Sequence, residues 1–440
     1  MNRKVSIIIP VIRPASARRC EEAIYENAGV PASQFEIVTA VDTEGIGCPE
    51  MVKMLTQKTK YDLVMFLGDD TVPQENFLKN ALMEMHDLPD GWGVVGLNSG
   101  GKESDKTKRS FIAHWLAHKN ILEHIEGGNF FSTDYVHCWG DVELSDIAKD
   151  LDRWTYAKDS IITHYHPIFD TAEWDDGYTK AYSPENRIYD EREYYKRKRA
   201  RMEKKYGTRL AIAEPLTFDM VHSQFHFSSR NVIIQYIMHL VRSNDYINID
   251  LLTPDFPGQI DAVRNNLVEK ALRLGSTHIL MMDTDQIYSD PDMIKKMISH
   301  KKPVVGARVH RRYPPFDPLM MRGEMGVHYP VPDEEIFKDG EFASLVEVDA
   351  TGCGCVLYDT SVFIDMFPAQ WFKMRVGDKG QPIGEDIGFC ADLKEAGIDI
   401  FVDCSIDIKH ITLLAADWGT YKLYEKLTGL KGGNKNGKCK

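Results

Sequence analysis

Short apolar runs alternate with amphipathic segments at the start of the chain. Residues 5–10 and 35–42 are rich in Val and Ile, which is typical of buried strands. Residues 17–27 and 49–58 carry apolar positions at the spacing of a helix. Strands that alternate with helices in this way predict an α/β fold.

The next apolar run ends abruptly in carboxylates, at Asp69 and Asp70. Ligands in open α/β sheets collect at the carboxyl ends of strands, so acidic residues at this place are candidates for chemistry. The same arrangement returns about two hundred residues later, where an apolar run ends in Asp283 and Asp285. Aligning the two segments places Asp70 on Asp285, and Gly68 on Asp283.

A second acidic element and a histidine follow in each half of the chain. Asp141 precedes His164 by 23 residues, and Asp386 precedes His410 by 24 residues. Three elements in one order, found twice with nearly equal spacing, indicate a tandem duplication.

Length and composition agree with this organisation. The 440 residues suffice for two or three domains. We expect one domain over residues 1–190, a charged helical linker over 191–208, a second domain over 209–425, and a flexible basic tail over 426–440.

Charge, cysteine spacing and hydropathy argue against several classes of protein. The 53 basic and 66 acidic residues give a net charge of −13, which argues against a protein that coats nucleic acid. The eight cysteines lack the spacing of a zinc site, so we expect reduced thiols. Neither a signal-peptide pattern nor an apolar stretch of ~20 residues is present, which favours a cytoplasmic protein (the host cytoplasm if viral) without integral membrane association.

The recurring side chains suggest a type of chemistry. Carboxylates and a histidine at strand ends form a ligand set that suits Mn²⁺ or Mg²⁺. Such an ion typically bridges phosphate oxygens, and a further carboxylate can act as general base toward a hydroxyl. Together these groups predict transfer to an alcohol with a diphosphate leaving group.

These residues resemble the GT-A type glycosyltransferases, in particular the large inverting family that includes chitin and hyaluronan synthase domains. The second half resembles small bacteriophage-encoded GT-A proteins through the segments 261–265, 281–285, 303–307, 350–352 and 384–386 and through His410. The first half resembles the same fold through 5–10, 41–42, 68–70, 140–141 and His164. The resemblance implies two tandem GT-A domains, which are Rossmann-like with a mixed central sheet. It also implies a metal-dependent, inverting transferase that uses a nucleotide-sugar, most often a UDP-sugar, and a carbohydrate, lipid-linked or protein hydroxyl acceptor.

In the second half, the resemblance makes Asp283 and Asp285 the DxD pair, with Asp285 on the metal and Asp283 near the nucleotide ribose or the metal. It makes His410 a further metal ligand and Asp386 the catalytic base. Arg264 and Asn265, which stand near a predicted helix start, are candidates to hold the nucleotide or its phosphates. A helix-surface location of these two residues is the alternative.

In the first half, the corresponding assignments are Asp70 and His164 for the metal, with His166 as a competing ligand, and Asp141 for the base. Asp42 and Asp69 are expected at the nucleotide donor.

Two positions of the first half depart from the family pattern. Gly68 replaces the first DxD aspartate, and Gly140 stands where the second half has Glu385. Activity is therefore better supported in the second half than in the first.

Other functions stay open at this point. One half can be catalytic while the other only holds the acceptor. Glycosylation of phage DNA bases is disfavoured by the net charge, although the basic cluster at residues 196–201 keeps a nucleic acid partner open. A non-catalytic sugar-binding or virion protein is a further alternative, and a nucleotidyltransferase is a lesser one.

Overall fold

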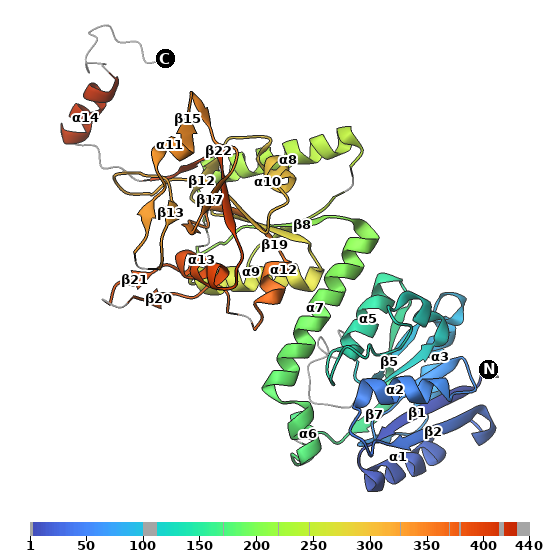
Figure 1. Cartoon of the computed structure of the whole chain (residues 1–440). Helices are drawn as coiled ribbons and strands as arrows, with labels where there is room; N and C mark the ends of the chain where they lie inside the picture. Colours follow the sequence, from blue (N-terminus) through green and yellow to red (C-terminus); the bar gives the residue numbers. More distant parts are fainter. Residues whose placement is uncertain are drawn as a thin grey trace. The chain divides into compact units, whose positions relative to one another are not determined.

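The computed structural model describes residues 3–99, 112–169, 171–218, 220–245, 247–325, 327–368, 370–377, 380–412 and 418–428. The chain divides into two compact units, Met1–Ala200 and Arg201–Lys440, and each is described here by itself (Figure 1). Nearly all of the basic tail expected over residues 426–440 lies outside the described residues.

The first unit is built on a mixed sheet of seven strands. Their order is β2-β1-β3-β6-β5-β7-β4. Strand β6 is antiparallel to both β3 and β5, and β4 is antiparallel to β7, while the other neighbours are parallel. The strands are β1 (Val5–Val11), β2 (Phe35–Val41), β3 (Leu63–Phe66), β4 (Thr71–Pro73), β5 (Val94–Asn98), β6 (Trp115–His118) and β7 (Trp154–His164).

Helices cover both faces of this sheet because successive side chains of its strands point to opposite faces and are apolar on both. Helices α1 (Pro14–Asn27) and α3 (Phe77–Asp87) share one buried cluster with the strands. Helices α2 (Cys48–Gln57) and α5 (Gly140–Asp150) share the cluster on the opposite face. The remaining helical segments are η1 (Ala32–Gln34), η2 (Pro89–Gly91), η3 (Lys119–His124), η4 (Pro167–Phe169), α6 (Asp176–Ala181) and α7 (Pro184–Tyr206).

The second unit repeats this topology. Its main sheet has the order β11-β22-β12-β19-β10-β8-β9, which is the order of the first sheet read from the other end, and β17 pairs with β22. Strand β19 is antiparallel to β10 and β12, as β6 is to its neighbours. The strands are β8 (Arg209–Ala213), β9 (Asn248–Leu252), β10 (His278–Met282), β11 (Gln286–Tyr288), β12 (Val304–Val309), β17 (Val346–Val348), β19 (Cys355–Asp359) and β22 (Ile400–His410).

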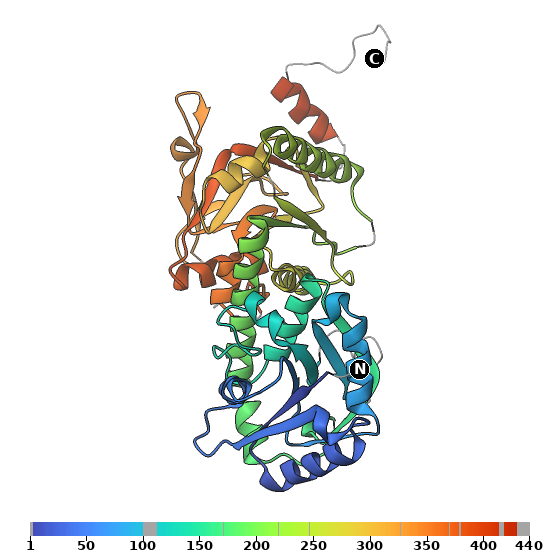
Figure 2. The same cartoon turned by 90° about the vertical axis from the view of Figure 1, so that its right-hand side faces the viewer.

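Helices again lie on both faces (Figures 1 and 2). Helices α8 (Ser223–Ser243) and α10 (Met293–Ser299) pack on one side of the sheet, and α9 (Ile260–Leu274), α12 (Ser361–Asp365) and α13 (Glu385–Glu395) lie on the other. Helix α14 (Trp418–Thr428) follows β22. The smaller elements are β13 (Met320–Arg322), β14 (Tyr329–Pro330), α11 (Asp333–Ile336), β15 (Phe337–Lys338), β16 (Glu341–Phe342), β18 (Ala350–Thr351), β20 (Arg375–Val376) and β21 (Pro382–Ile383).

Even a local irregularity of the sheet occurs twice. The register of β5 against β7 shifts after Leu97, and that of β12 against β22 shifts after Ala307. The predicted α/β fold with mixed central sheets is therefore confirmed, and its repetition is visible in strand order, direction and register.

The charged segment predicted as a linker belongs to the long helix α7. Asp190 is fully buried in the first unit and accepts hydrogen bonds from the backbone N–H groups of Val136, His137 and Cys138. Arg197 forms an ion pair with the buried Glu143. The first compact unit runs through Ala200, because one face of α7 packs on its core, and the domain bounds expected from the sequence stay a prediction.

Two further expectations concern cysteines and hydropathy. All seven cysteines in the described parts of the chain are free thiols, and five of them are buried. None of the described helices combines the length and apolar character required to cross a bilayer.

Candidate active sites

An aspartate and a histidine meet at the same point of each sheet. Asp70 directly precedes β4, whose first residue pairs with His164 at the end of β7. Asp285 directly precedes β11, whose first residue pairs with His410 at the end of β22. The Asp70 Oδ1 and His164 Nε2 atoms lie 3.3 Å apart, and the Asp285 Oδ2 and His410 Nε2 atoms lie 3.2 Å apart. The same pairing of two strands therefore brings an aspartate and a histidine together in each unit.

A cavity of about 540 Å³ adjoins the pair of the first unit. All six residues that the sequence assigned to this half, including the competing ligand, contribute to its wall. They are Asp42, Asp69, Asp70, Asp141, His164 and His166.

The Asp70 carboxylate is held as an anion by its neighbours. Tyr178, on α6, donates its hydroxyl hydrogen to Asp70 Oδ2 over 2.5 Å, and His164 contacts the other oxygen. Burial alone would raise the pKa of Asp70, but the contacts with His164 and Tyr178 hold it well below its usual value. The Arg13 guanidinium lies 3.7 Å from the centre of the Tyr178 ring, which fixes the ring between the β1–α1 loop and the cavity.

Two further histidines stand beside this pair. His114 and His166 are 2% and 4% exposed. Burial, together with the nearby His164, lowers the pKa of His114 to about 3 and that of His166 to about 4, so both are neutral at pH 7. Neutral imidazoles retain a lone pair and can accept a hydrogen bond or a metal ion. The sequence analysis missed His114, which no motif marks.

Asp69 and Asp42 are engaged with the backbone. Asp69 Oδ2 accepts hydrogen bonds from the N–H groups of Ile12 and Arg13 over 2.7 and 2.6 Å. Burial raises the pKa of Asp69. Asp42 accepts the N–H groups of Ile46 and Gly47, each over 2.9 Å, and these bonds lower its pKa against the opposing effect of burial. Both residues therefore shape the loops around the cavity, and their contact with a donor stays a prediction.

Asp141 occupies the first turn of α5 and faces the cavity. Burial raises its pKa to about 6. The preceding Gly140 has no room for a side chain, because a Cβ there would lie 2.9 Å from the Phe131 ring. Trp139 before it adopts a φ of 71°, which is uncommon for a bulky residue and frequent near functional sites.

The pKa of Asp141 leads to an expected pH dependence. A carboxylate that accepts a proton must be ionised, so turnover by the first unit should rise with pH through about 6 and then level off. The measurement is kcat/KM against pH in a chain carrying Asp386→Asn, in which the second unit is silent. A profile that stays flat between pH 5 and 7 would contradict the assignment of Asp141 as the base.

In the second unit, a buried arginine joins two carboxylates. Arg264 on α9 is 3% exposed. Its Nη2 donates to both oxygens of Asp283 over 2.8 and 2.9 Å, and its Nη1 donates to Glu385 Oε1 over 2.5 Å. We call these three residues the ion triad. The triad ties α9, the end of β10 and the start of α13 together, and so it sets the position of Asp386, the next residue on α13.

Asn265 also serves an internal contact. Its amide nitrogen donates to the Phe372 carbonyl over 2.7 Å, and its amide oxygen accepts the Phe372 N–H over 3.1 Å. Both terminal nitrogens of Arg264 and the side-chain amide of Asn265 are therefore engaged within the protein. Their contact with a donor stays a prediction.

The first unit lacks all three members of the ion triad. Gly68 and Gly140 stand at the positions of Asp283 and Glu385, and Val52 is the fifth residue of α2 as Arg264 is the fifth residue of α9. A Cβ on Gly68 would lie 2.6 Å from Asp70 Oδ1 and 3.4 Å from His114 Nε2. The glycines at positions 68 and 140 therefore belong together with the missing arginine, because an Asp or Glu at either position without the arginine would be a buried, unpaired charge.

The sequence also assigned Asp386 and Asp285 to the site of the second unit. Asp386 Oδ1 accepts the N–H of Ile387 over 2.8 Å, and its other oxygen lies close to Gly352. Asp285 contacts His410 and the guanidinium of Arg312, a residue that the sequence analysis missed.

The residues present fit a divalent ion in each unit. A carboxylate oxygen and an imidazole nitrogen within 3.3 Å are suitable ligands for Mn²⁺ or Mg²⁺. Among the described residues, no group of three His, Cys, Asp or Glu side chains converges on one point. An ion would therefore complete its coordination with water and phosphate oxygens, as Mg²⁺ commonly does.

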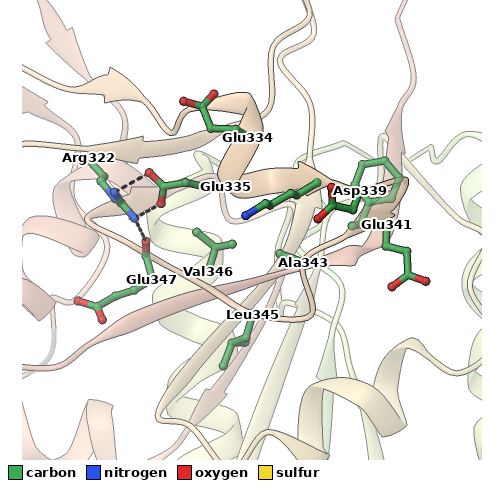
Figure 3. Close-up of a pocket in the computed structure, with 11 residues that line it drawn as sticks. Arg322, Glu334, Glu335, Asp339, Glu341, Ala343, Leu345, Val346 and Glu347 are labelled. Carbon is green, nitrogen blue, oxygen red and sulfur yellow. Dashed lines mark hydrogen bonds and ion pairs between the residues drawn. The ribbon is translucent and has the colours of Figure 1, made fainter.

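A separate hollow of about 670 Å³ lies in the segment between β12 and β19 (Figure 3). In it, Arg322 forms an ion pair with Glu335 and donates to the Glu347 carbonyl (Figure 3). The hollow contains none of the residues that the sequence assigned to a site.

Parts of the chain resemble solved structures at low sequence identity. No family model and no curated protein matches the chain. Solved structures that match in part include the mannosyltransferase PcManGT from Pyrobaculum calidifontis with GDP-Man and Mn²⁺, at 16% identity and a TM-score of 0.35, covering 44% of this chain and 64% of that one. S. aureus TarS with UDP-GlcNAc matches at 13% identity and a TM-score of 0.31, covering 45% and 65%. A Drosophila galactosyltransferase 7 with manganese and UDP-Gal matches at 14% identity and a TM-score of 0.28, covering 41% and 80%.

Proposed function

We propose that this protein is a metal-dependent glycosyltransferase of the GT-A type, with one candidate active site in each unit. The observation that carries the proposal is the repeated constellation: a strand-end aspartate, a strand-end histidine within 3.3 Å of it, and an aspartate in the first turn of the helix before the histidine strand. A purely structural role does not require the third group. The donor proposed from the resemblance is a nucleotide-sugar, most often a UDP-sugar, and the acceptor is a hydroxyl of a carbohydrate, lipid-linked or protein substrate.

Asp141 and Asp386 are the proposed catalytic bases. Each accepts the proton of the acceptor hydroxyl while the oxygen attacks the anomeric carbon and the bond to the diphosphate breaks. Attack opposite the leaving group would invert the configuration. The raised pKa of Asp141 matches this role, because a base with a pKa near the working pH is the most effective.

Asp70 with His164, and Asp285 with His410, are the proposed metal ligands. A bound Mn²⁺ or Mg²⁺ would offset the negative charge that grows on the departing diphosphate. In the second unit, the ion triad keeps the Asp283 and Asp386 segments in place around that position.

A first test is turnover of a panel of UDP-, GDP- and dTDP-sugars by the full chain with Mn²⁺, followed by a chelator. We expect hydrolysis or transfer of at least one donor, and its loss by more than about a hundredfold with chelator, since charge stabilisation of this kind contributes several kcal/mol. Addition of Mn²⁺ should restore the activity. Absence of turnover for all donors and acceptors would favour a sugar-binding protein.

A second candidate function is a chain with one catalytic unit and an accessory first unit. Two observations favour it: the first unit lacks the ion triad, and the Asp70 carboxylate is already engaged by Tyr178 and His164. Separate substitution of the two proposed bases distinguishes the candidates.

A further inference from the structure

Arg312, which follows β12, reaches the aspartate–histidine pair of the second unit. Its Nη2 donates to Asp285 Oδ2, and its Nε donates to His410 Nε2 over 3.2 Å. The Arg312 side chain is 43% exposed, compared with 25% for Asp285 and 14% for His410. A more exposed cationic side chain therefore covers a more buried pair from the solvent side.

The hydrogen bonds around His410 define which nitrogen carries the proton. His410 Nδ1 faces the carbonyl oxygen of His310 at 2.8 Å, so Nδ1 is the protonated nitrogen and donates. Nε2 then presents a lone pair toward Arg312 and toward Asp285 Oδ2. Two acceptor atoms 3.2 Å apart repel each other unless a cation lies against both. Arg312 supplies that cation here.

We infer that Arg312 is a ligand-binding residue with two alternating contacts: it neutralises Asp285 and donates to the neutral His410 while the divalent ion is absent, and it binds the diphosphate of the donor once the ion is present. This inference rests on the proposed function. The guanidinium and the ion compete because both need the same carboxylate oxygen and the same Nε2 lone pair. A displaced guanidinium remains at the rim of the site, and its planar array of donors matches phosphate oxygens.

The first unit provides an internal comparison. There the corresponding aspartate, Asp70, receives the neutral hydroxyl of Tyr178 in addition to its contact with His164. A neutral donor does not replace the charge of a divalent ion. The competition between a guanidinium and the divalent ion is therefore a property of the second site.

The test uses the full chain carrying Asp70→Asn, so that the second site dominates the titration. Mn²⁺ alone is titrated by electron paramagnetic resonance, and UDP and GDP are then titrated by calorimetry at saturating Mn²⁺. Arg312→Gln should tighten Mn²⁺ binding by about tenfold and weaken binding of the nucleoside diphosphate by about tenfold, the scale of one charge-assisted hydrogen bond. Arg311→Gln is the matched control, because Arg311 pairs with Asp317 instead, and it should change neither affinity by more than about twofold.

The opposite signs of the two effects separate this role from a structural one, since a destabilised site would lose both affinities. Loss of both affinities, or no change in either, in Arg312→Gln would overturn the inference. Asp285→Asn tests the proposed function independently. If it leaves Mn²⁺ binding unchanged, the metal site itself is wrong; if it abolishes binding while Arg312→Gln has no effect, only the role of Arg312 fails.

Discussion

Asp386→Asn is expected to reduce sugar transfer by the second unit by about 10²- to 10⁴-fold, the contribution of a general base. The amide has nearly the same shape as the carboxylate but does not accept the proton of the acceptor hydroxyl. Affinity for the donor should stay within about threefold, because the base contacts the acceptor and not the diphosphate. The measurement is kcat and KM for each donor that the wild-type chain uses.

The controls for this experiment lie in the same chain. Asp392→Asn, on the same helix α13, removes a carboxylate that pairs with Arg375 and should leave kcat unchanged. Asp141→Asn gives the corresponding test of the first unit. If the two base variants abolish the use of different donors, the protein has two active sites; if only Asp386→Asn has an effect, the first unit is accessory. A fully active Asp386→Asn would contradict its role as the base.

Arg264→Met is expected to destabilise the second unit by about 3–5 kcal/mol, the usual cost of removing one partner of a buried ion pair. The substitution leaves Asp283 and Glu385 without the guanidinium that donates to both. The measurement is the free energy of unfolding, obtained from a urea titration that is monitored through a signal of the second unit.

A matched variant on the same helix checks the cause. Arg273→Met removes an exposed arginine of α9 that pairs with Glu269 over 3.6 Å, and it should change stability by less than about 0.5 kcal/mol. Adding Glu385→Gln to Arg264→Met should restore part of the loss, because it removes one uncompensated charge. Equal effects of the two arginine substitutions would show that the triad contributes little.

Several features could be predicted from the sequence because they depend on neighbours along the chain. The alternation of strands and helices follows from the spacing of apolar residues. Helix α9 ends at Gly275, whose φ of 69° suits glycine at a helix C-terminus, and a glycine at such a position is visible in the sequence. The approach of Asp70 to His164, and of Asp285 to His410, followed from their positions at the ends of strands of one sheet.

Other features depend on which distant segments meet. Tyr178 reaches Asp70 across 108 residues of sequence, Arg312 reaches His410 across 98, and Arg264 reaches Glu385 across 121. No periodicity marks these side chains, since their partners lie on other elements. The same holds for α7, where the burial of Asp190 and the ion pair of Arg197 with Glu143 pack the first part of the helix on the first unit.

The α/β class, the repeated order of motifs, and the aspartates and histidines at strand ends could be predicted from the sequence alone, because strand ends and helix starts are local properties of the chain. The tertiary structure decided how those groups are used. In the folded protein, Arg264 and Asn265 make internal contacts. The two glycines of the first unit stand where the second unit has two members of the ion triad. Arg312 contacts both Asp285 and His410. The physical reason is that pairing and burial of charge depend on side chains that only the packed sheet and its helices bring together.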